Sequence, residues 1–188
     1  TAVGHVMNSL GVKDLSGLFE GATNFNENVG TWNVSEVTDM SGMFRTVESF
    51  NQDIGGWNVH RVEDMSSMFQ NARDFNQDIS AWNVERVTDM NSMFRTAESF
   101  NHNIGGWNVH KVVDMSGMFE NANAFNHDIS NWNVEQVTDM SQMFLGATSF
   151  NRDISTWNVE RVVNMTEMFT NTALVNTDTG KNIFYTWV

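Results

Sequence analysis

The sequence has no cysteine and no proline in its 188 residues. Without cysteine there are neither disulfides nor thiolate ligands for a metal, and this absence fits the cytosol as well as the cell surface. Without proline, the turns must be made by Asn, Asp, Ser and Gly, which suits an array of short elements. No run of 18 apolar residues occurs, so we expect no direct membrane insertion.

Positive charge is also scarce. Ten Lys and Arg stand against 23 Asp and Glu, which gives a formal net charge of −13 and a pI near 4.5. Nucleic acid and anionic membrane surfaces would repel such a chain, so we expect neither as a partner. The chain begins TAVGHVMNSL, with neither a signal peptide nor a lipid-attachment cysteine, and we expect it to be a piece of a longer protein.

The apolar residues that are present, 40% of the chain, recur with a period of 25 residues. Twelve of the 13 Met and 13 of the 14 Phe residues fall into two columns each. A tryptophan occupies one position of each repeat: Trp32, Trp57, Trp82, Trp107, Trp132 and Trp157. Large apolar residues in one phase are typical of a stack in which every coil buries the same face against its neighbours.

Two spacings within each repeat predict two elements. The step from Met65 to Ala72 places apolar residues at i, i+3, i+4 and i+7, as on one face of a short helix, with Asp64 as its N-cap. Trp57 and Val59 flank a polar residue, which is the period of a half-buried strand. The expected fold class is an α/β repeat solenoid with one short parallel strand and one short helix per repeat. Because strands stack about 4.8 Å apart and helices about 10 Å, the sheet would lie on a concave side.

The ends depart from the repeat, as the ends of such stacks must. Residues 1–25 keep part of the pattern and are predicted to be a degenerate N-terminal capping coil. Residues 26–175 hold six repeats, and residues 176–188 form a C-terminal cap of the same single domain. We expect the segment from Ile183 to Val188 to be a strand that covers the last coil.

The unit FNQDIGGWNVHRVEDMSSMFQNA and its copies resemble the BspA-type leucine-rich-repeat family of bacterial and mycoplasma surface lipoproteins. The resemblance covers residues 10–178. It implies a right-handed leucine-rich-repeat-like solenoid displayed outside the cell, on a bacterial surface, for adhesion or partner binding. It implies no catalytic residues and does not identify a ligand.

Three columns of polar residues are predicted to be structural. The column from Asn26 to Asn176 is expected to be a buried asparagine ladder that pairs loop backbone groups from coil to coil. The column from Asn33 to Asn158 lies between inward Trp and Val residues and is predicted to be an exposed ladder along the sheet, which a ligand could use. The column from Asp39 to Asp139 is predicted to cap the helices.

A fourth column raises the question of calcium. Its carboxylates stack at Asp53, Asp78, Asp128 and Asp153, with Asn103 interrupting the column between Asp78 and Asp128. Calcium between coils would relieve their repulsion with oxygen ligands, whereas each Asp can also cap its own turn without metal. No other cofactor is expected. His60 and His110 stand two coils apart, too far to share one zinc ion.

Residues that differ between copies on an exposed face are the candidates for ligand contact. The residue after each inward Val varies between Ser, His and Glu, and the next column holds four of the ten cations. A solvated sheet face with paired charges remains the alternative. The predicted ligand-binding residues of the concave face are Asn58, His60, Arg61, Asn83, Glu85, Arg86, Asn108, His110, Lys111, Asn133 and Glu135.

The function predicted from the sequence is a non-enzymatic cell-surface module that binds a protein or a glycan. The alternative is a passive spacer within a larger adhesin, with calcium as a stiffening ion. Variation between copies on the helix side, at Arg45, Gln70 and Glu120, is as large as on the sheet side and keeps the spacer open. An enzyme is not expected, because no catalytic constellation stands apart from the repeat.

Overall fold

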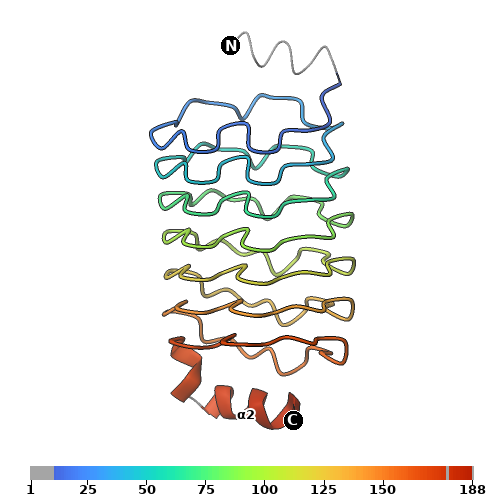
Figure 1. Ribbon diagram of the computed structural model, residues 1–188, viewed down its shortest axis with the longest axis vertical. Helices are drawn as coiled ribbons and strands as arrows, with labels where there is room; N and C mark the ends of the chain where they lie inside the picture. The colour runs from blue at the N-terminus through green and yellow to red at the C-terminus, as the bar shows by residue number, and fades with distance from the viewer. Residues whose placement is uncertain (1–10, 177, 188) are drawn as a thin grey trace.

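The structure is a computed structural model that describes residues 11–176 and 178–187. The chain winds into coils of one repeat each, stacked one upon another with a short helix at the C-terminal end (Figure 1). Asp14 pairs with Asp39 through an isolated parallel bridge, and the same pairing continues down the stack to Asn164. The stack therefore follows the sequence period coil by coil.

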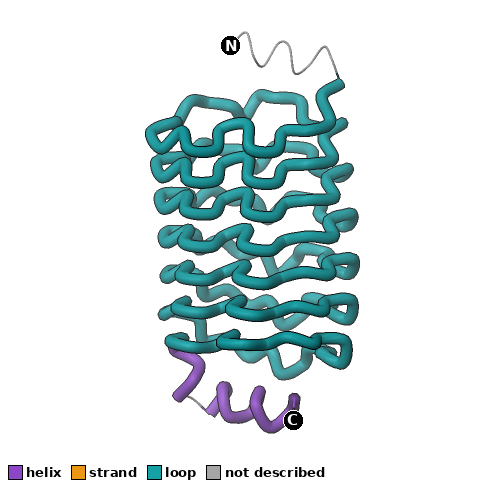
Figure 2. Tube along the Cα trace, viewed as in Figure 1, coloured by secondary structure: helices purple, strands orange, loops and turns teal. Residues whose placement is uncertain are grey.

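The helix and strand predicted for each repeat are wrong. Within the described residues the helices are the 3-10 helix η1 (Ala173–Asn176) and the α-helix α2 (Asp178–Trp187), and strand pairing is limited to the isolated bridges. Figure 2 shows the coils as loop throughout. The chain is therefore not an α/β solenoid with a strand and a helix per repeat.

Left-handed residues explain why the i, i+3, i+4, i+7 step does not form a helix. Ser67 has a φ of 56° and Asn71 a φ of 59°, and each coil has a positive φ at both equivalent positions. A helix of L-residues cannot hold a left-handed residue at every fourth position. Small or polar residues occupy these positions: Gly17, Gly21, Gly42, Thr46, Ser67, Asn71, Ser92, Thr96, Gly117, Asn121, Gln142, Gly146, Glu167 and Asn171.

The backbone of this segment bonds to the next coil and to itself in alternation. Every second N–H from Met65 to Asn71 donates to a carbonyl of the next coil, at 2.7–3.1 Å. Between them the N–H of Met68 donates to the carbonyl of Met65 at 3.2 Å, as in a turn. The four bonds to the next coil recur at each of the six junctions. We call residues 65–71 and their equivalents the donor wall.

The residues that flank the donor wall are also bonded to a neighbouring coil, but in the reverse direction. The N–H of Glu63 donates to the carbonyl of Thr38 at 2.8 Å, and the N–H of Asp74 donates to the carbonyl of Glu48 at 3.0 Å. Bonds in both directions thus hold successive coils at the strand spacing of about 4.8 Å. The bend was predicted because helices are wider than strands. Since the coils in the described residues contain no such helices, the predicted bend is wrong, and these residues form no concave sheet.

The core consists of aromatic and aliphatic columns inside the stack of coils. Trp82 is 3% exposed, and its ring lies 6.4 Å from that of Trp57 and 6.5 Å from that of Trp107. Its Nε1 donates to the carbonyl of Ile54 in the preceding coil at 3.1 Å. The predicted core position of the Trp column is therefore confirmed. The Met and Phe columns of the central coils are buried in the same way.

A helix closes the C-terminal end, so the strand predicted from Ile183 is wrong. The ring of Trp187 in α2 stacks 6.4 Å from that of Trp157, where the Trp of a further coil would lie. Leu174 and Ile183 are buried at this end. Val188, and residues 1–10 of the predicted N-terminal capping coil, lie outside the described residues.

Candidate functional site

The eleven predicted ligand-binding residues lie in segment 58–61 and its equivalents in the next three coils. Asn58 and Arg61 are exposed and His60 is half-buried, while Val59 and Val62 are buried. The next three coils repeat this alternation. The side chains reach solvent from turns rather than from a sheet. We call this set of eleven residues the candidate face.

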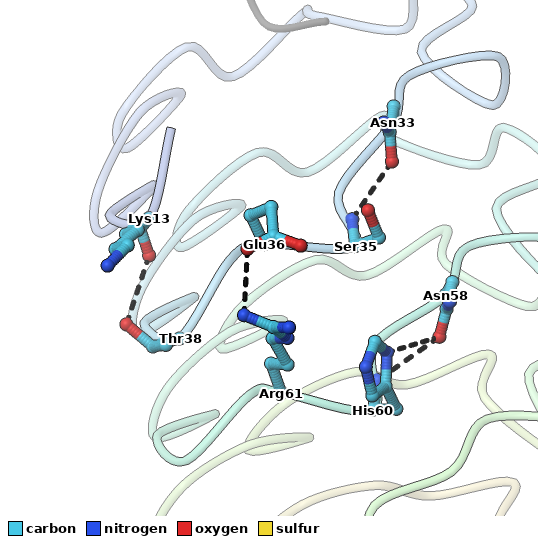
Figure 3. A network of polar contacts seen from close by, with 8 residues as sticks. All are labelled: Lys13, Asn33, Ser35, Glu36, Thr38, Asn58, His60 and Arg61. Atoms are coloured by element: carbon cyan, nitrogen blue, oxygen red, sulfur yellow. Dashed lines mark hydrogen bonds and ion pairs between the residues drawn. The ribbon is translucent and has the colours of Figure 1, made fainter. Parts of the chain in front are cut away.

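Each asparagine of the candidate face accepts a hydrogen bond within its own turn. Asn83 Oδ1 accepts the N–H of Glu85 at 3.1 Å, and in the coil shown in Figure 3 Asn58 Oδ1 lies 2.8 Å from Nδ1 of His60. Such Asx turns fix an asparagine, because its side chain takes the place of a backbone acceptor. The recurrence of this column therefore has a structural cause that the sequence alone did not reveal.

The cations of the candidate face differ in what they contact. Arg61 Nη1 lies 2.8 Å from Glu36 Oε2 of the preceding coil (Figure 3), and both side chains are 45% exposed. An ion pair this open contributes little stability. Arg86 and Lys111 follow in the same column and have no ion pair or hydrogen bond to another described residue. These two exposed cations are therefore available to a ligand.

A shallow hollow of about 340 Å³ lies between the fifth and sixth repeats at one end of the candidate face. The residues that line it are Ser130, Asn131, Trp132, Asn133, Val134, Glu135, Thr156 and Asn158. Asn133 and Glu135 are the two predicted residues among them. Its lining of amide, carboxylate and hydroxyl groups can hydrogen-bond a sugar or a peptide edge, with the rim of the Trp132 ring as an apolar contact.

The predicted calcium column makes turns of its own. Oδ1 of Asp53 accepts the N–H of Gly55 at 3.0 Å, and Oδ1 of Asp78 accepts that of Ser80 at 2.9 Å. Hydrogen bonds from the hydroxyl and the N–H of Ser80 lower the pKa of Asp78. Asp128 and Asp153 make the same contact with their own turns. No group of three or more metal-ligating side chains occurs in the described part of the chain.

The predicted asparagine ladder is present, but it is not buried. The Oδ1 of Asn51 accepts the N–H of Asn76 in the next coil at 2.9 Å, and these contacts continue from Asn26 to Asn151. Its members are exposed or half-buried. The next column, in which long side chains donate to the ladder, was not predicted. Gln77 Nε2 lies 2.9 Å from the carbonyl of Asn51, and His102, His127 and Arg152 occupy the equivalent place.

The column from Asp39 to Asp139 caps turns and not helices. Asp39 Oδ1 accepts the N–H of Ser41 at 2.8 Å. Burial raises the pKa of Asp89, and the neighbouring carboxylates of this column add to the rise. Hydrogen bonds from Asn91 lower the pKa but do not outweigh burial. Burial also acts on Asp139, but hydrogen bonds from Ser141 and Asn164 outweigh it and lower the pKa. The pKa values of the stacked carboxylates thus differ because their own turn and the next coil donate different hydrogen bonds.

The donor wall has two features that the sequence did not indicate. A groove of about 370 Å³ crosses its first three coils and is lined by Ser16, Gly17, Glu20, Ser41, Gly42, Arg45, Ser66 and Ser67. Further along, Glu120 is only 6% exposed and pairs through Oε1 with Arg95 at 2.9 Å, while its Oε2 has no partner. Position in the repeat did not predict this burial, because the equivalent Glu20 is exposed.

Stacked 25-residue coils without repeated helices or strands, and with polar turns along each side, define the chain as a repeat protein. It belongs to the family described as "Mycoplasma protein of unknown function, DUF285", which matches residues 5–107 and 78–182. The resemblance to the BspA-type family is not confirmed. No curated protein and no solved structure is significantly similar to the chain. None of the helices in the described residues has the length and apolar character needed to cross a bilayer.

Proposed function

We propose that the protein is a non-enzymatic binding module that recognises a protein or a glycan through the candidate face. One observation supports this best: exposed side chains vary from coil to coil on a backbone that does not. His60, Glu85, His110 and Glu135 hold the same place in four successive coils, after a buried valine each time. Such a face can change its ligand while the core stays constant.

We propose that this binding takes place outside the cell, on a bacterial surface, as the resemblance to the BspA-type family implies. The family to which the chain belongs is described only by its mycoplasma source and its unknown function. The net charge of −13 still argues against nucleic acid. Arg86 and Lys111 supply the local positive charge for acidic groups of a glycan or a protein.

A set of four substitutions tests the proposal. Changing His60, Glu85, His110 and Glu135 to Ser copies what Ser35 already has in the first repeat. None of these residues is in the core, so each change should cost about 0.5 kcal/mol or less. The wild type is screened against glycans and extracellular-matrix proteins, and any ligand found should bind the variant at least tenfold more weakly.

The matched control is a triple Ser variant of Glu20, Arg45 and Gln70 on the donor wall. These three residues are exposed or half-buried, and Glu20 and Arg45 form an open ion pair at 3.3 Å. We exclude Arg95 and Glu120 from the control because their pair is partly buried. If the control abolishes binding and the four-residue variant does not, the ligand binds the donor wall.

The second candidate function is a passive spacer. Hydrogen bonds join successive coils at every junction, which favours a stiff rod, and the exposed residues of the donor wall vary as much as those of the candidate face. A screen that returns no ligand for the wild type would favour the spacer over the binding module.

A further inference from the structure

One column of the repeat, from Glu36 to Arg161, holds four of the ten Lys and Arg residues of the chain. Two of these cations reach back to the column residue of the preceding coil. Arg61 Nη1 lies 2.8 Å from Glu36 Oε2 (Figure 3), and Arg161 Nη1 lies 2.6 Å from Gln136 Oε1. A long cationic side chain in this column therefore finds its partner one coil towards the N-terminus.

Arg86 and Lys111 cannot make this contact, because the residue one coil before each of them is another cation. Arg61 precedes Arg86 in the column, and Arg86 precedes Lys111. Both side chains are exposed and have no ion pair or hydrogen bond to another described residue. Three cations thus follow one another at about 4.8 Å per coil, and only the first is paired. Since like charges this close repel, an anion between Arg86 and Lys111 would be stabilised by both.

The charge changes sign in the coil after Lys111. Glu135 is exposed and stands beside Gln136, the next residue of the column. Its carboxylate lines the hollow of about 340 Å³, together with the exposed side chains of Asn131 and Thr156. Glu135 is the one charged residue in that lining. The candidate face therefore combines two unpaired cations with a neighbouring hollow that can hydrogen-bond hydroxyl groups but offers no positive charge.

We propose that the ligand of the candidate face is an oligosaccharide with a single acid group, either a carboxylate or a sulfate ester. The acid group lies between Arg86 and Lys111, and an uncharged sugar of the same ligand lies in the hollow and hydrogen-bonds Glu135 and Asn131. This inference rests on the proposed function and narrows its ligand to one class. The order of charges along the face fixes the direction of the sugar chain on the stack.

A single acid group fits the face better than many. The chain has a net charge of −13, and Glu135 would face a second acid group of the ligand. A polyanion would be attracted by Arg86 and Lys111 but repelled by the acidic surface around them. An uncharged sugar in the hollow avoids this repulsion and uses the amide, hydroxyl and carboxylate groups that line it.

A sugar also fits the face better than a peptide. A peptide that binds as an added strand needs a free strand edge, whereas strand pairing in the described residues is limited to isolated bridges between coils. A peptide that binds through its side chains needs an apolar pocket as an anchor. Trp132 and Val134, the two apolar residues of the hollow, are only 3% and 1% exposed. They offer the rim of a ring and no apolar pocket.

A glycan array with matched sugars tests for the acid group. Each neutral oligosaccharide is printed beside the same sugar with one terminal carboxylate and the same sugar with one terminal sulfate ester. At least one acid-bearing sugar should bind the wild type about tenfold more tightly than its neutral counterpart, as expected for hydrogen bonds to a charged group. The two acid arms identify which acid is bound. Dextran sulfate, a polyanion, should compete poorly.

The double variant Arg86→Gln with Lys111→Gln should reduce this preference to about threefold or less and leave binding of the neutral sugar unchanged. The matched control is Arg45→Gln with Arg73→Gln. It removes the same charge from two exposed ion pairs, at 3.3 Å each, and should keep the preference. Asn131→Ala in the hollow should weaken neutral and acid-bearing sugars by the same factor. Thermal melts check that all variants are folded.

Three results would overturn the inference: equal binding of neutral and acid-bearing sugars, a preference that survives in the double variant or disappears in the control, and an array without any bound sugar. The proposed function fails separately. A protein or neutral sugar that the four-residue Ser variant no longer binds, but the double variant binds as the wild type does, would refute the single acid group and leave the binding module standing.

Discussion

Trp107→Ala removes a ring from the interior of the tryptophan column. Trp107 is 3% exposed, and its ring centroid lies 6.5 Å from that of Trp82 and 6.4 Å from that of Phe94. Its Nε1 donates to the carbonyl of Ile79 at 3.2 Å. Two coils therefore lose contact at once. The loss falls in the fourth of six repeats, where coils on both sides depend on the junction.

Truncating a large aromatic side chain in a core costs about 3–5 kcal/mol. For a chain of this length each kcal/mol lowers the melting temperature by about 2–4 °C, so the expected fall is about 6–20 °C. The lost hydrogen bond accounts for about 1 kcal/mol of this figure, and the carbonyl of Ile79 still accepts the N–H of Trp82 at 3.1 Å. Urea unfolding followed by far-ultraviolet circular dichroism, with thermal melts beside it, measures both quantities.

Trp107→Phe separates packing from the hydrogen bond. It keeps an aromatic ring in the column and loses the N–H, so it should cost less than the alanine variant, with about 1 kcal/mol of its cost due to the hydrogen bond. Glu85→Ala on the candidate face is the exposed control and should change stability by about 0.5 kcal/mol or less. A loss below about 1 kcal/mol for Trp107→Ala would mean that the ring is not packed between coils. The tryptophan column would then have to be considered again as a surface for stacking sugars.

Three further predictions concern charge. Arg95→Ala leaves the buried carboxylate of Glu120 without its partner and should cost about 1–3 kcal/mol, whereas Arg45→Ala at an exposed pair should cost less than about 1 kcal/mol; urea unfolding compares them. Asp89 has a raised pKa, so its negative charge destabilises the fold once the pH exceeds 3.8, the ordinary pKa of an aspartate. Asp89→Asn should therefore raise the free energy of unfolding by about 0.5 kcal/mol at pH 7, and this gain should disappear below pH 3.8. Asp139 has a lowered pKa, so Asp139→Asn should lower the free energy of unfolding at pH 7. Thermal melts from pH 2.5 to 7 test the direction of the change for both variants. Calcium and a chelator should give the same melting temperature, because the stacked aspartates of the calcium column already cap their own turns; a strong rise with calcium would reverse that conclusion.

The stack, its period and its core followed from the sequence, because identical large residues in one phase leave few ways to be buried. The Trp column shows this most directly. It was predicted to be core, and its members from Trp57 to Trp157 are 3–4% exposed. The exposure of the candidate face followed from the same alternation, because Val59 and Val84 are buried and their neighbours are not.

The local backbone was not predicted, because apolar spacing records which side chains face inward and not how the chain turns between them. Met65 and Met68 can face the core from a helix, or from a segment with left-handed residues between them. The signal that distinguishes the two lies in the residues between the apolar ones. Gly, Asn or Thr stands four residues after Gly or Ser in most coils, as at Gly17 and Gly21 or Ser67 and Asn71. Gly and Asn adopt positive φ readily, and all four residue types are poorer helix formers than Ala.

For the candidate site, the exposed residues could be predicted from the sequence, but the contacts between coils could not. Glu120 is buried against Arg95, while Glu20 in the same column is exposed beside Arg45. Glu120 pairs with an arginine of the preceding coil and Glu20 with one of the following coil, and one sequence position does not carry that information.

Thr96 offers a direct test of the left-handed backbone, because glycine and alanine there should rank in opposite orders in the two conformations. In a helix, Ala is more stable than Gly by about 1 kcal/mol. Thr96 has a φ of 58°, where a Cβ atom costs about 1–2 kcal/mol, so here Gly should be more stable than Ala by about 1 kcal/mol. Gly21 and Gly146 already occupy this position in other coils. Urea unfolding of Thr96→Gly and Thr96→Ala gives the sign. As a control, the same pair is made at Ala97, whose φ is not positive and where Gly should be the less stable. If Thr96→Ala proves the more stable of its pair, the left-handed backbone at this position, and with it the donor wall, is refuted.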